Sequence, residues 1–285
     1  MRELTVIAAD GHQFSVRLHE ASTPRGVIVL APAMGVPATY YDRFAVALAE
    51  QGIHVAVTDL RGQGSSSLRA GRGCDWGYAD MVEQDWPALT NAIADVWPSL
   101  PLWFLGHSQG GQLSLLYLAH RPANVAGVLT IACGSTYFRG WNFPQSLKLL
   151  VQTQFVRVPA ALLGYFPGER LGFGGRQARS EMADWANAGL DGRYDLRGAA
   201  LDYEAALAQA ERPVHLFSLD GDAFAPRGAT AVLARKLPPA LVQHHHLTDE
   251  HLPSAARDHF RWSRHPEAVI PFLLDAAGLR QGAAD

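Results

Sequence analysis

Residues 106–110 of the sequence, GHSQG, present a serine in a setting that suits nucleophilic chemistry. An apolar run at residues 102–105 precedes them and predicts a strand, and residues 111–118 predict a helix. Glycines two positions before and after Ser108 allow a sharp turn that leaves the hydroxyl exposed. The helix N-terminus beneath the turn places partial positive charge where an oxyanion would form. The pattern therefore predicts Ser108 as a nucleophile and the Gln109 backbone N–H as one oxyanion donor.

A serine hydroxyl is a poor nucleophile at neutral pH unless a base accepts its proton and an acid orients that base. In a strand–turn–helix setting of this kind the chain order is serine, acid and then histidine. The acid is expected after the apolar strand at residues 214–218, where the sequence reads SLDGDAFAP. Asp222 is the preferred acid. Asp220 is the alternative, and it suits a turn with Gly221.

The base is expected in a loop before the closing helix at residues 266–277. His259 lies at the expected distance before this helix, and His251 is the alternative. The consecutive histidines at 244–246 lie in a predicted strand, where neighbouring side chains face opposite sides. No cysteine or carboxylate stands at ligand spacing from them, so we expect no metal site. His107 is expected to pack beneath the serine.

The second oxyanion donor is expected in the loop after the strand at residues 27–30. Pro32 has no N–H, so Met34 is the preferred donor and Ala33 the alternative. The loop at residues 59–65, DLRGQGS, lacks the lysine and the spacing of a phosphate-binding P-loop. We expect it to be a structural turn, and no cofactor is predicted.

The elements that must hold these residues alternate between short apolar strands and amphipathic helices. This order predicts an α/β fold with a mostly parallel sheet and helices on both faces. Residues 4–8 and 13–19 flank the turn signal Asp10-Gly11 and predict an antiparallel hairpin at the start. Residues 1–134 and 212–285 are expected to form the core. The aromatic-rich stretch 135–211 is expected to be an inserted helical cap over the carboxyl edge of the sheet.

Composition narrows the classes of function. The 285 residues are 48% hydrophobic and 18% charged, with a net charge of −3, so the chain can bury a core. No basic stripe supports nucleic-acid binding. Cys74 and Cys133 cannot form a disulfide framework, which favours a reducing compartment. The N-terminus is not a signal peptide and no apolar run spans a bilayer, so a cytoplasmic protein is expected.

With these segments in order, the chain resembles the α/β-hydrolase superfamily over nearly its whole length. The resemblance rests on VIVLAPAMG, DLRGQGSS, GHSQGG, LDGDAFAP and HFRWSR. The segment YFPGERLGFGG with DWAN after it is similar to a bacterial subgroup related to serine aminopeptidase-like and lysophospholipase-like proteins. The resemblance implies a catalytic triad of Ser108, Asp222 and His259, with Gln109 and Met34 in the oxyanion hole.

The resemblance further implies hydrolysis of a carboxylic ester or thioester of a small acyl substrate through an acyl-serine intermediate. Acyl transfer and C–C bond hydrolysis use the same triad and stay open as alternatives. A non-enzymatic ligand sensor is a third reading. The sequence departs from the common His-Gly oxyanion motif at Pro32 and Ala33, and it has Asp258 and Arg261 around the histidine instead of glycines. The acyl group, the leaving group and the oligomeric state are not specified by the sequence.

Overall fold

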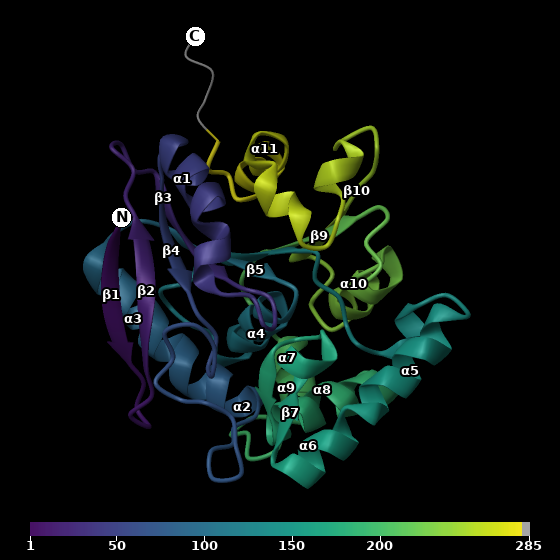
Figure 1. Ribbon diagram of the computed structural model, residues 1–285. Helices are drawn as coiled ribbons and strands as arrows, with labels where there is room; N and C mark the ends of the chain where they lie inside the picture. Colours follow the sequence, from purple (N-terminus) through teal and green to yellow (C-terminus); the bar gives the residue numbers. More distant parts are fainter. Residues whose placement is uncertain (281–285) are drawn as a thin grey trace.

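A sheet of eight strands runs through residues 1–280, which are the residues that the computed structural model describes. Its order is β1-β2-β4-β3-β5-β6-β9-β10 (Figure 1). The first two pairings, β1 with β2 and β2 with β4, are antiparallel, and all further pairings in this sheet are parallel. The predicted α/β fold with an antiparallel start is thereby confirmed. The strands are β1 (Arg2–Ile7), β2 (Gln13–His19), β3 (Gly26–Ala31), β4 (Ile53–Thr58), β5 (Leu102–His107), β6 (Gly127–Ile131), β9 (Val214–Leu219) and β10 (Val242–Leu247).

The central strands are apolar on both sides because helices cover both faces of the sheet. In β3, Val27 and Val29 join one core cluster, whereas Ile28 and Leu30 join the other. This alternation follows from the two-residue period of a strand. Residues of α3 and α4 pack in the first cluster, and residues of α1 and α11 pack in the second. The helices of this core are α1 (Asp42–Glu50), α2 (Tyr78–Asp80), α3 (Trp86–Val96), α4 (Gln109–Tyr117), α10 (Arg227–Ala234) and α11 (Pro266–Ala276).

The long interval between β6 and β9 forms its own group of elements, at the lower right of Figure 1. We call residues 135–211 within it the insertion. Its two short strands pair antiparallel with each other in a separate two-stranded sheet. Its elements are α5 (Gln145–Phe155), α6 (Arg157–Leu163), β7 (Tyr165–Pro167), α7 (Gly168–Leu171), β8 (Arg176–Ala178), α8 (Arg179–Asp191) and α9 (Tyr203–Leu207).

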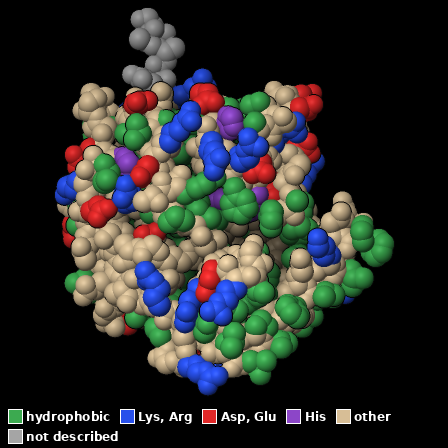
Figure 2. All heavy atoms as spheres, in the orientation of Figure 1, with side chains coloured by type: hydrophobic (Ala, Val, Ile, Leu, Met, Phe, Trp, Pro, Cys, Tyr) green, Lys and Arg blue, Asp and Glu red, His purple; other side chains and the backbone are tan. Residues whose placement is uncertain are grey.

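The insertion also carries an exposed apolar stripe. Its members follow one another at intervals of three or four residues, from a phenylalanine just before α5 along α5 and α6, and each is more than half exposed. Figure 2 shows hydrophobic side chains along the outer edge of this part of the molecule. Among residues 1–280, no helix combines the length and the hydropathy needed to cross a bilayer. The stripe consists of Phe143, Leu147, Val151, Phe155, Val158 and Leu162.

Candidate active site

Ser108 lies in the turn between β5 and α4, where the sequence predicts it. Its φ of 52° and ψ of −116° place a non-glycine residue in a sparsely populated backbone region. Such strain persists only where the surrounding structure imposes it, and it is concentrated at functional sites. From Leu102 to Ala119 every residue is buried except Ser108. The turn therefore lifts one side chain out of an otherwise buried strand and helix.

The two glycines that flank this turn are required by close contacts. A Cβ on Gly106 would lie 2.2 Å from the Cα of Gly111, and a Cβ on Gly110 would lie 2.3 Å from the carbonyl oxygen of Ala31. Real Cβ atoms do not approach other heavy atoms this closely, so any side chain here would push the helix away from the strand. The spacing of the motif follows from this packing of α4 against β3 and β5.

Asp222 and His259 form a buried hydrogen-bonded pair. The Nδ1 atom of His259 lies 2.9 Å from Oδ2 and 3.1 Å from Oδ1 of Asp222. Asp222 lies in the loop after β9, and its Oδ1 also accepts hydrogen bonds from the backbone N–H groups of Phe224 and Ala225. The Asp222 side chain is 0% exposed and that of His259 is 5% exposed. The loop thus fixes the carboxylate and the carboxylate fixes the imidazole ring.

The segment that carries His259 is anchored next to the serine turn. The ring centroid of His259 lies 5.0 Å from that of His107, the residue directly before Ser108. The hydroxyl of Tyr40 donates to the carbonyl of Phe260, at 2.8 Å. Trp262 is fully buried and packs edge-on against His107, with ring centroids 5.4 Å apart. The three residues that the sequence predicts as a triad are therefore supplied by three loops at one end of the sheet.

The alternative acid and base have other partners. Asp220 is half exposed and accepts a hydrogen bond from Arg257 at 2.8 Å. His251 bonds within its own turn to Thr248. Neither contacts His259 or His107 through any of the hydrogen bonds found among residues 1–280.

The three consecutive histidines lie on β10 and alternate between its two sides. His244 and His246 both bond to the hydroxyl of Ser218, at 2.8 and 2.9 Å, whereas His245 stacks on Phe217. Burial lowers the pKa of His244 to about 4, which keeps this ring neutral. Within the described residues, no group of three or more His, Cys, Asp or Glu side chains is arranged to hold a metal ion.

In the loop after β3, hydrogen bonding distinguishes the two candidates for the second oxyanion donor. The N–H of Ala33 donates to the hydroxyl of Tyr41 at 3.1 Å, so it is already engaged. Among the hydrogen bonds of residues 1–280, the N–H of Met34 has no acceptor. Gln109 is the first residue of α4, so its N–H has no acceptor within its own helix. This arrangement leaves the N–H groups of Gln109 and Met34 available to a ligand.

Tyr41 connects this loop with the serine turn. Its hydroxyl lies 2.7 Å from Nδ1 of His107, and both side chains are completely buried. Burial raises the pKa of Tyr41 and lowers the pKa of His107 well below its usual value, so both groups are neutral. Since the Tyr41 oxygen accepts from Ala33, its proton is free to be donated to Nδ1 of His107. No motif in the sequence indicates this role for Tyr41.

Elsewhere in the protein, a serine, a histidine and an aspartate form a hydrogen-bonded chain that is buried. His12 bonds through Nδ1 to Asp85 and through Nε2 to Ser66, each at 2.8 Å. Arg61 also bonds to both oxygens of Asp85, at 3.0 and 2.6 Å, and the Ser66 hydroxyl accepts from the N–H of Gly62. All of these side chains are buried. The network ties the 59–65 loop to the core, in agreement with its expected structural role, and the buried Ser66 is a poor candidate nucleophile.

Comparison with known proteins identifies the family. The family described as "Serine aminopeptidase, S33", a hydrolase family, matches residues 22–179, which is more than half of the chain. The chain belongs to this family. The matched stretch includes Met34, Ser108 and Gln109, whereas Asp222 and His259 follow it.

Two relatives that match part of the chain are named as lipases. The S33-family chain is 28% identical to a monoglyceride lipase of Rattus norvegicus over 128 residues, which are 45% of this chain and 41% of that protein. It is 33% identical to a monoacylglycerol lipase of Mycolicibacterium smegmatis over 106 residues, 37% of each chain. These matches span about two fifths of the relatives' length or less.

Solved structures resemble the whole chain in fold. The enzyme Est1E of Butyrivibrio proteoclasticus, solved with ferulic acid, has a TM-score of 0.66 at 13% identity and covers 96% of this chain and 99% of its own. An α/β hydrolase from Penicillium sp. sh18 has a TM-score of 0.64 at 16% identity and covers 99% of both chains. The α/β-hydrolase fold of this S33-family protein is thereby established.

One buried carboxyl group near the serine escapes sequence reasoning. Glu181 of α8 is 1% exposed, and its Oε1 accepts a hydrogen bond of 2.7 Å from the side-chain amide of Gln109. Its Oε2 accepts from the indole N–H of Trp76 at 3.1 Å. Burial raises the pKa of Glu181 to about 7, against the pull of these two donors. A single glutamate in a helix carries no signal for this role, because its partner lies 72 positions earlier.

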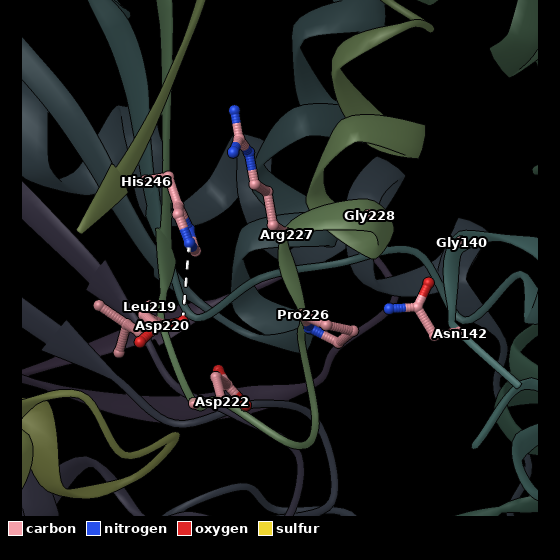
Figure 3. A pocket seen from close by; sticks show the side chains of 10 residues that line it. Gly140, Asn142, Leu219, Asp220, Asp222, Pro226, Arg227, Gly228 and His246 are labelled. Atoms are coloured by element: carbon pink, nitrogen blue, oxygen red, sulfur yellow. Dashed lines mark ion pairs between the residues drawn. The ribbon is translucent and has the colours of Figure 1, made fainter. Parts of the chain in front are cut away.

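A polar pocket of about 240 Å³ adjoins Asp222 but not the other two residues of the predicted triad. Figure 3 shows Asp220 and His246 facing one another at its wall, with 3.9 Å between His246 Nε2 and Asp220 Oδ1. Arg227 and Pro226 at the start of α10 form another side. Neither Ser108 nor His259 lines this pocket.

Proposed function

We propose that this protein is an esterase that cleaves a carboxylic ester or thioester through an acyl-serine intermediate. The observation that carries the proposal is the buried Asp222–His259 pair, which lies next to the strained turn that leaves Ser108 partly exposed. An imidazole held by a carboxylate next to an exposed serine is the arrangement that activates a hydroxyl for attack. The named lipase relatives support an ester as the substrate.

In the proposed mechanism, the Ser108 hydroxyl attacks the carbonyl carbon while the imidazole of His259 accepts its proton. Asp222 accepts the hydrogen bond from Nδ1 and stabilises the imidazolium that forms. The N–H groups of Gln109 and Met34 hold the oxyanion of the tetrahedral intermediate. When the intermediate collapses, His259 gives its proton to the leaving group, and water then releases the acyl group by the same steps.

An apolar acyl group suits the surroundings of the histidine. Phe224 is 54% exposed, with its ring centroid 5.1 Å from that of His259, and the ring centroid of Phe260 lies 4.8 Å away on the same histidine. Apolar substrate surface placed here would be removed from water together with these rings. We further propose that the insertion acts as a cap over this site and selects the acyl group.

The protein is further proposed to be cytoplasmic. Cys74 and Cys133 are free thiols, which supports a reducing, cytoplasmic location.

The test is a hydrolysis screen with p-nitrophenyl esters of increasing acyl length, the matching acyl thioesters, and aminoacyl p-nitroanilides as peptidase substrates. We expect turnover of esters or thioesters by the wild type and loss of essentially all turnover in Ser108→Ala. Preference for the anilides would replace the esterase proposal with a peptidase. Wild-type activity in Ser108→Ala would refute the catalytic role of this serine.

A further inference from the structure

Both residues that offer free oxyanion N–H groups are contacted by one short segment of the insertion, residues 174–181. This segment begins in the glycine-rich turn after α7, forms β8 and ends in the first turn of α8. Its two ends meet different parts of the site: one meets the loop after β3 and the other meets the N-terminus of α4.

The first contact joins backbone to backbone. A Cβ on Gly35 would lie 2.5 Å from the carbonyl carbon of Gly174 and 2.9 Å from the nitrogen of Gly175. In the reverse direction, a Cβ on Gly174 would lie 2.8 Å from Sδ of Met34. The absence of side chains on these glycines therefore allows the insertion to press directly against the loop that contains the Met34 N–H.

The second contact is the buried hydrogen bond from Gln109 to Glu181. The same carboxylate accepts from Trp76, whose carbonyl in turn accepts from the Glu181 backbone N–H at 2.8 Å. Glu181 is the third residue of α8, where the helix N-terminus favours a negative charge. Tyr78 and Asp184 also lie at this junction, where the N–H of Tyr78 donates to the Asp184 carboxylate at 2.9 Å.

The segment between the two contacts is itself held in place. The side-chain amide of Gln177, which is completely buried, donates to the carbonyl of Gly174. Strand β8 pairs with β7 over three residues. The positions of the loop after β3 and of Gln109 are thus tied to one another through residues 174–181.

We propose that Gly174 and Glu181 are positioning residues that hold the two oxyanion donors, Met34 and Gln109, at the geometry the reaction needs. The proposal rests on the proposed esterase function. It makes the insertion part of the catalytic apparatus and not only a cover that selects substrates. Because the oxyanion develops during the reaction, loss of this positioning should lower kcat and leave KM nearly unchanged.

The first test is a double-mutant cycle on the Gln109–Glu181 pair, with p-nitrophenyl butyrate as substrate. Removal of an oxyanion donor lowers kcat by about 10²–10³-fold, so displacing one should cost about 10- to 100-fold. Glu181→Gln should cause this loss, because an amide offers one acceptor to two donors. Gln109→Ala should cause a similar loss, and the double variant should be no worse than either. As the matched control, Asp191→Asn makes the same change from carboxyl to amide at the exposed end of the same helix, where Asp191 bonds only to the N–H of Arg193, and should keep wild-type kcat.

The second test compares two glycines of the same turn that have similar positive φ angles. Gly172 and Gly174 have φ values of 72° and 69°, so an alanine is placed in the left-handed region at both positions. A Cβ on Gly172 meets nothing within 4 Å, whereas a Cβ on Gly174 meets Met34. Gly174→Ala should lower kcat, and Gly172→Ala should not. This pair does not depend on the stability of the Glu181 variants.

A trifluoromethyl ketone with a four-carbon acyl chain separates positioning from general damage, because its adduct with Ser108 carries an oxyanion. The inhibition constant should rise in Glu181→Gln and Gly174→Ala roughly in proportion to the loss of kcat. The inference is overturned if the wild type hydrolyses the ester, Ser108→Ala does not, and yet both variants keep wild-type kcat and inhibition. It is equally overturned if both matched controls lose as much activity. Lack of ester turnover by the wild type would instead refute the proposed function.

Discussion

The carboxylate of Asp222 lies 2.9 Å from Nδ1 of His259, and the same carboxylate accepts two backbone N–H groups from its own loop. This relationship distinguishes Asp222 from Asp220, which is two residues away but faces Arg257 at the surface. A carboxylate held from three directions cannot turn away from the imidazole without losing all three bonds. The orientation of the histidine is therefore built into the loop after β9.

Asp222→Asn should lower kcat for ester hydrolysis by about 10⁴-fold, because an amide at this position favours the wrong tautomer of His259. Steady-state kinetics with p-nitrophenyl butyrate measures the effect. Asp220→Asn is the matched control and should keep activity within about twofold. A larger loss in Asp220→Asn than in Asp222→Asn would reverse the assignment of the acid.

His259→Gln should abolish ester turnover to a similar extent, since no other base within residues 1–280 is bonded to Asp222. His251→Gln should retain activity, because His251 bonds to Thr248 in an exposed turn. Both variants are measured under the same conditions with the same ester. Activity that survives in His259→Gln and disappears in His251→Gln would contradict the site described above.

Tyr41→Phe should lower the free energy of unfolding by about 1–3 kcal/mol, because it leaves the Ala33 N–H and Nδ1 of His107 buried without their partner. Urea unfolding monitored by circular dichroism gives this value. Tyr40→Phe removes a hydroxyl that is only part-buried and should cost less. Equal effects of the two substitutions would argue against the buried Ala33–Tyr41–His107 connection.

Glu181 should make stability fall as the pH rises through neutrality. Its pKa is about 7 in the folded protein and 4.5 when exposed, so between these values the folded state binds a proton that the unfolded state has released. The stabilisation is complete below pH 4.5 and is lost as the pH rises through 7, by up to about 3 kcal/mol at about 1.4 kcal/mol per pKa unit.

Urea unfolding of the wild type and of Glu181→Gln at pH 5 and pH 8 tests this. The free energy of unfolding of the wild type relative to the variant should be lower at pH 8 than at pH 5. Asp184, whose pKa burial raises to about 6, is present in both proteins, so its own effect largely cancels in the difference. A difference that does not change with pH would show that Glu181 does not titrate in this range.

The fold and the places of Ser108, Asp222 and His259 follow from local patterns in a known order. Each lies in a loop directly after a recognisable strand or before a recognisable helix, so the topology of parallel strands brings them to one end of the sheet. Their catalytic roles stay predictions. The sequence already favours Met34 over Ala33 as the second oxyanion donor, but the physical reason is visible only in the structure, where the Ala33 N–H donates to the Tyr41 hydroxyl.

Contacts between the insertion and the core were beyond sequence reasoning for a different reason. Glu181 is one acidic residue among eight acidic and eight basic residues at 135–211, and nothing in its neighbours distinguishes it. Its contact with the site is visible only in the folded protein, where α8 places the Glu181 carboxylate within hydrogen-bond distance of Gln109 and Trp76. Likewise, the glycines at 172–175 predict a turn, but not that this turn presses on Gly35.

The central claim, that Ser108 is the activated nucleophile, is tested most directly by peptide mass mapping after treatment with a fluorophosphonate probe. We predict one adduct, on the peptide that contains Ser108, and none on the buried Ser66, although Ser66 bonds to the histidine of a histidine–aspartate pair. His259→Gln should prevent the labelling. An adduct on another serine, or none at all on a folded wild-type protein, would contradict the claim.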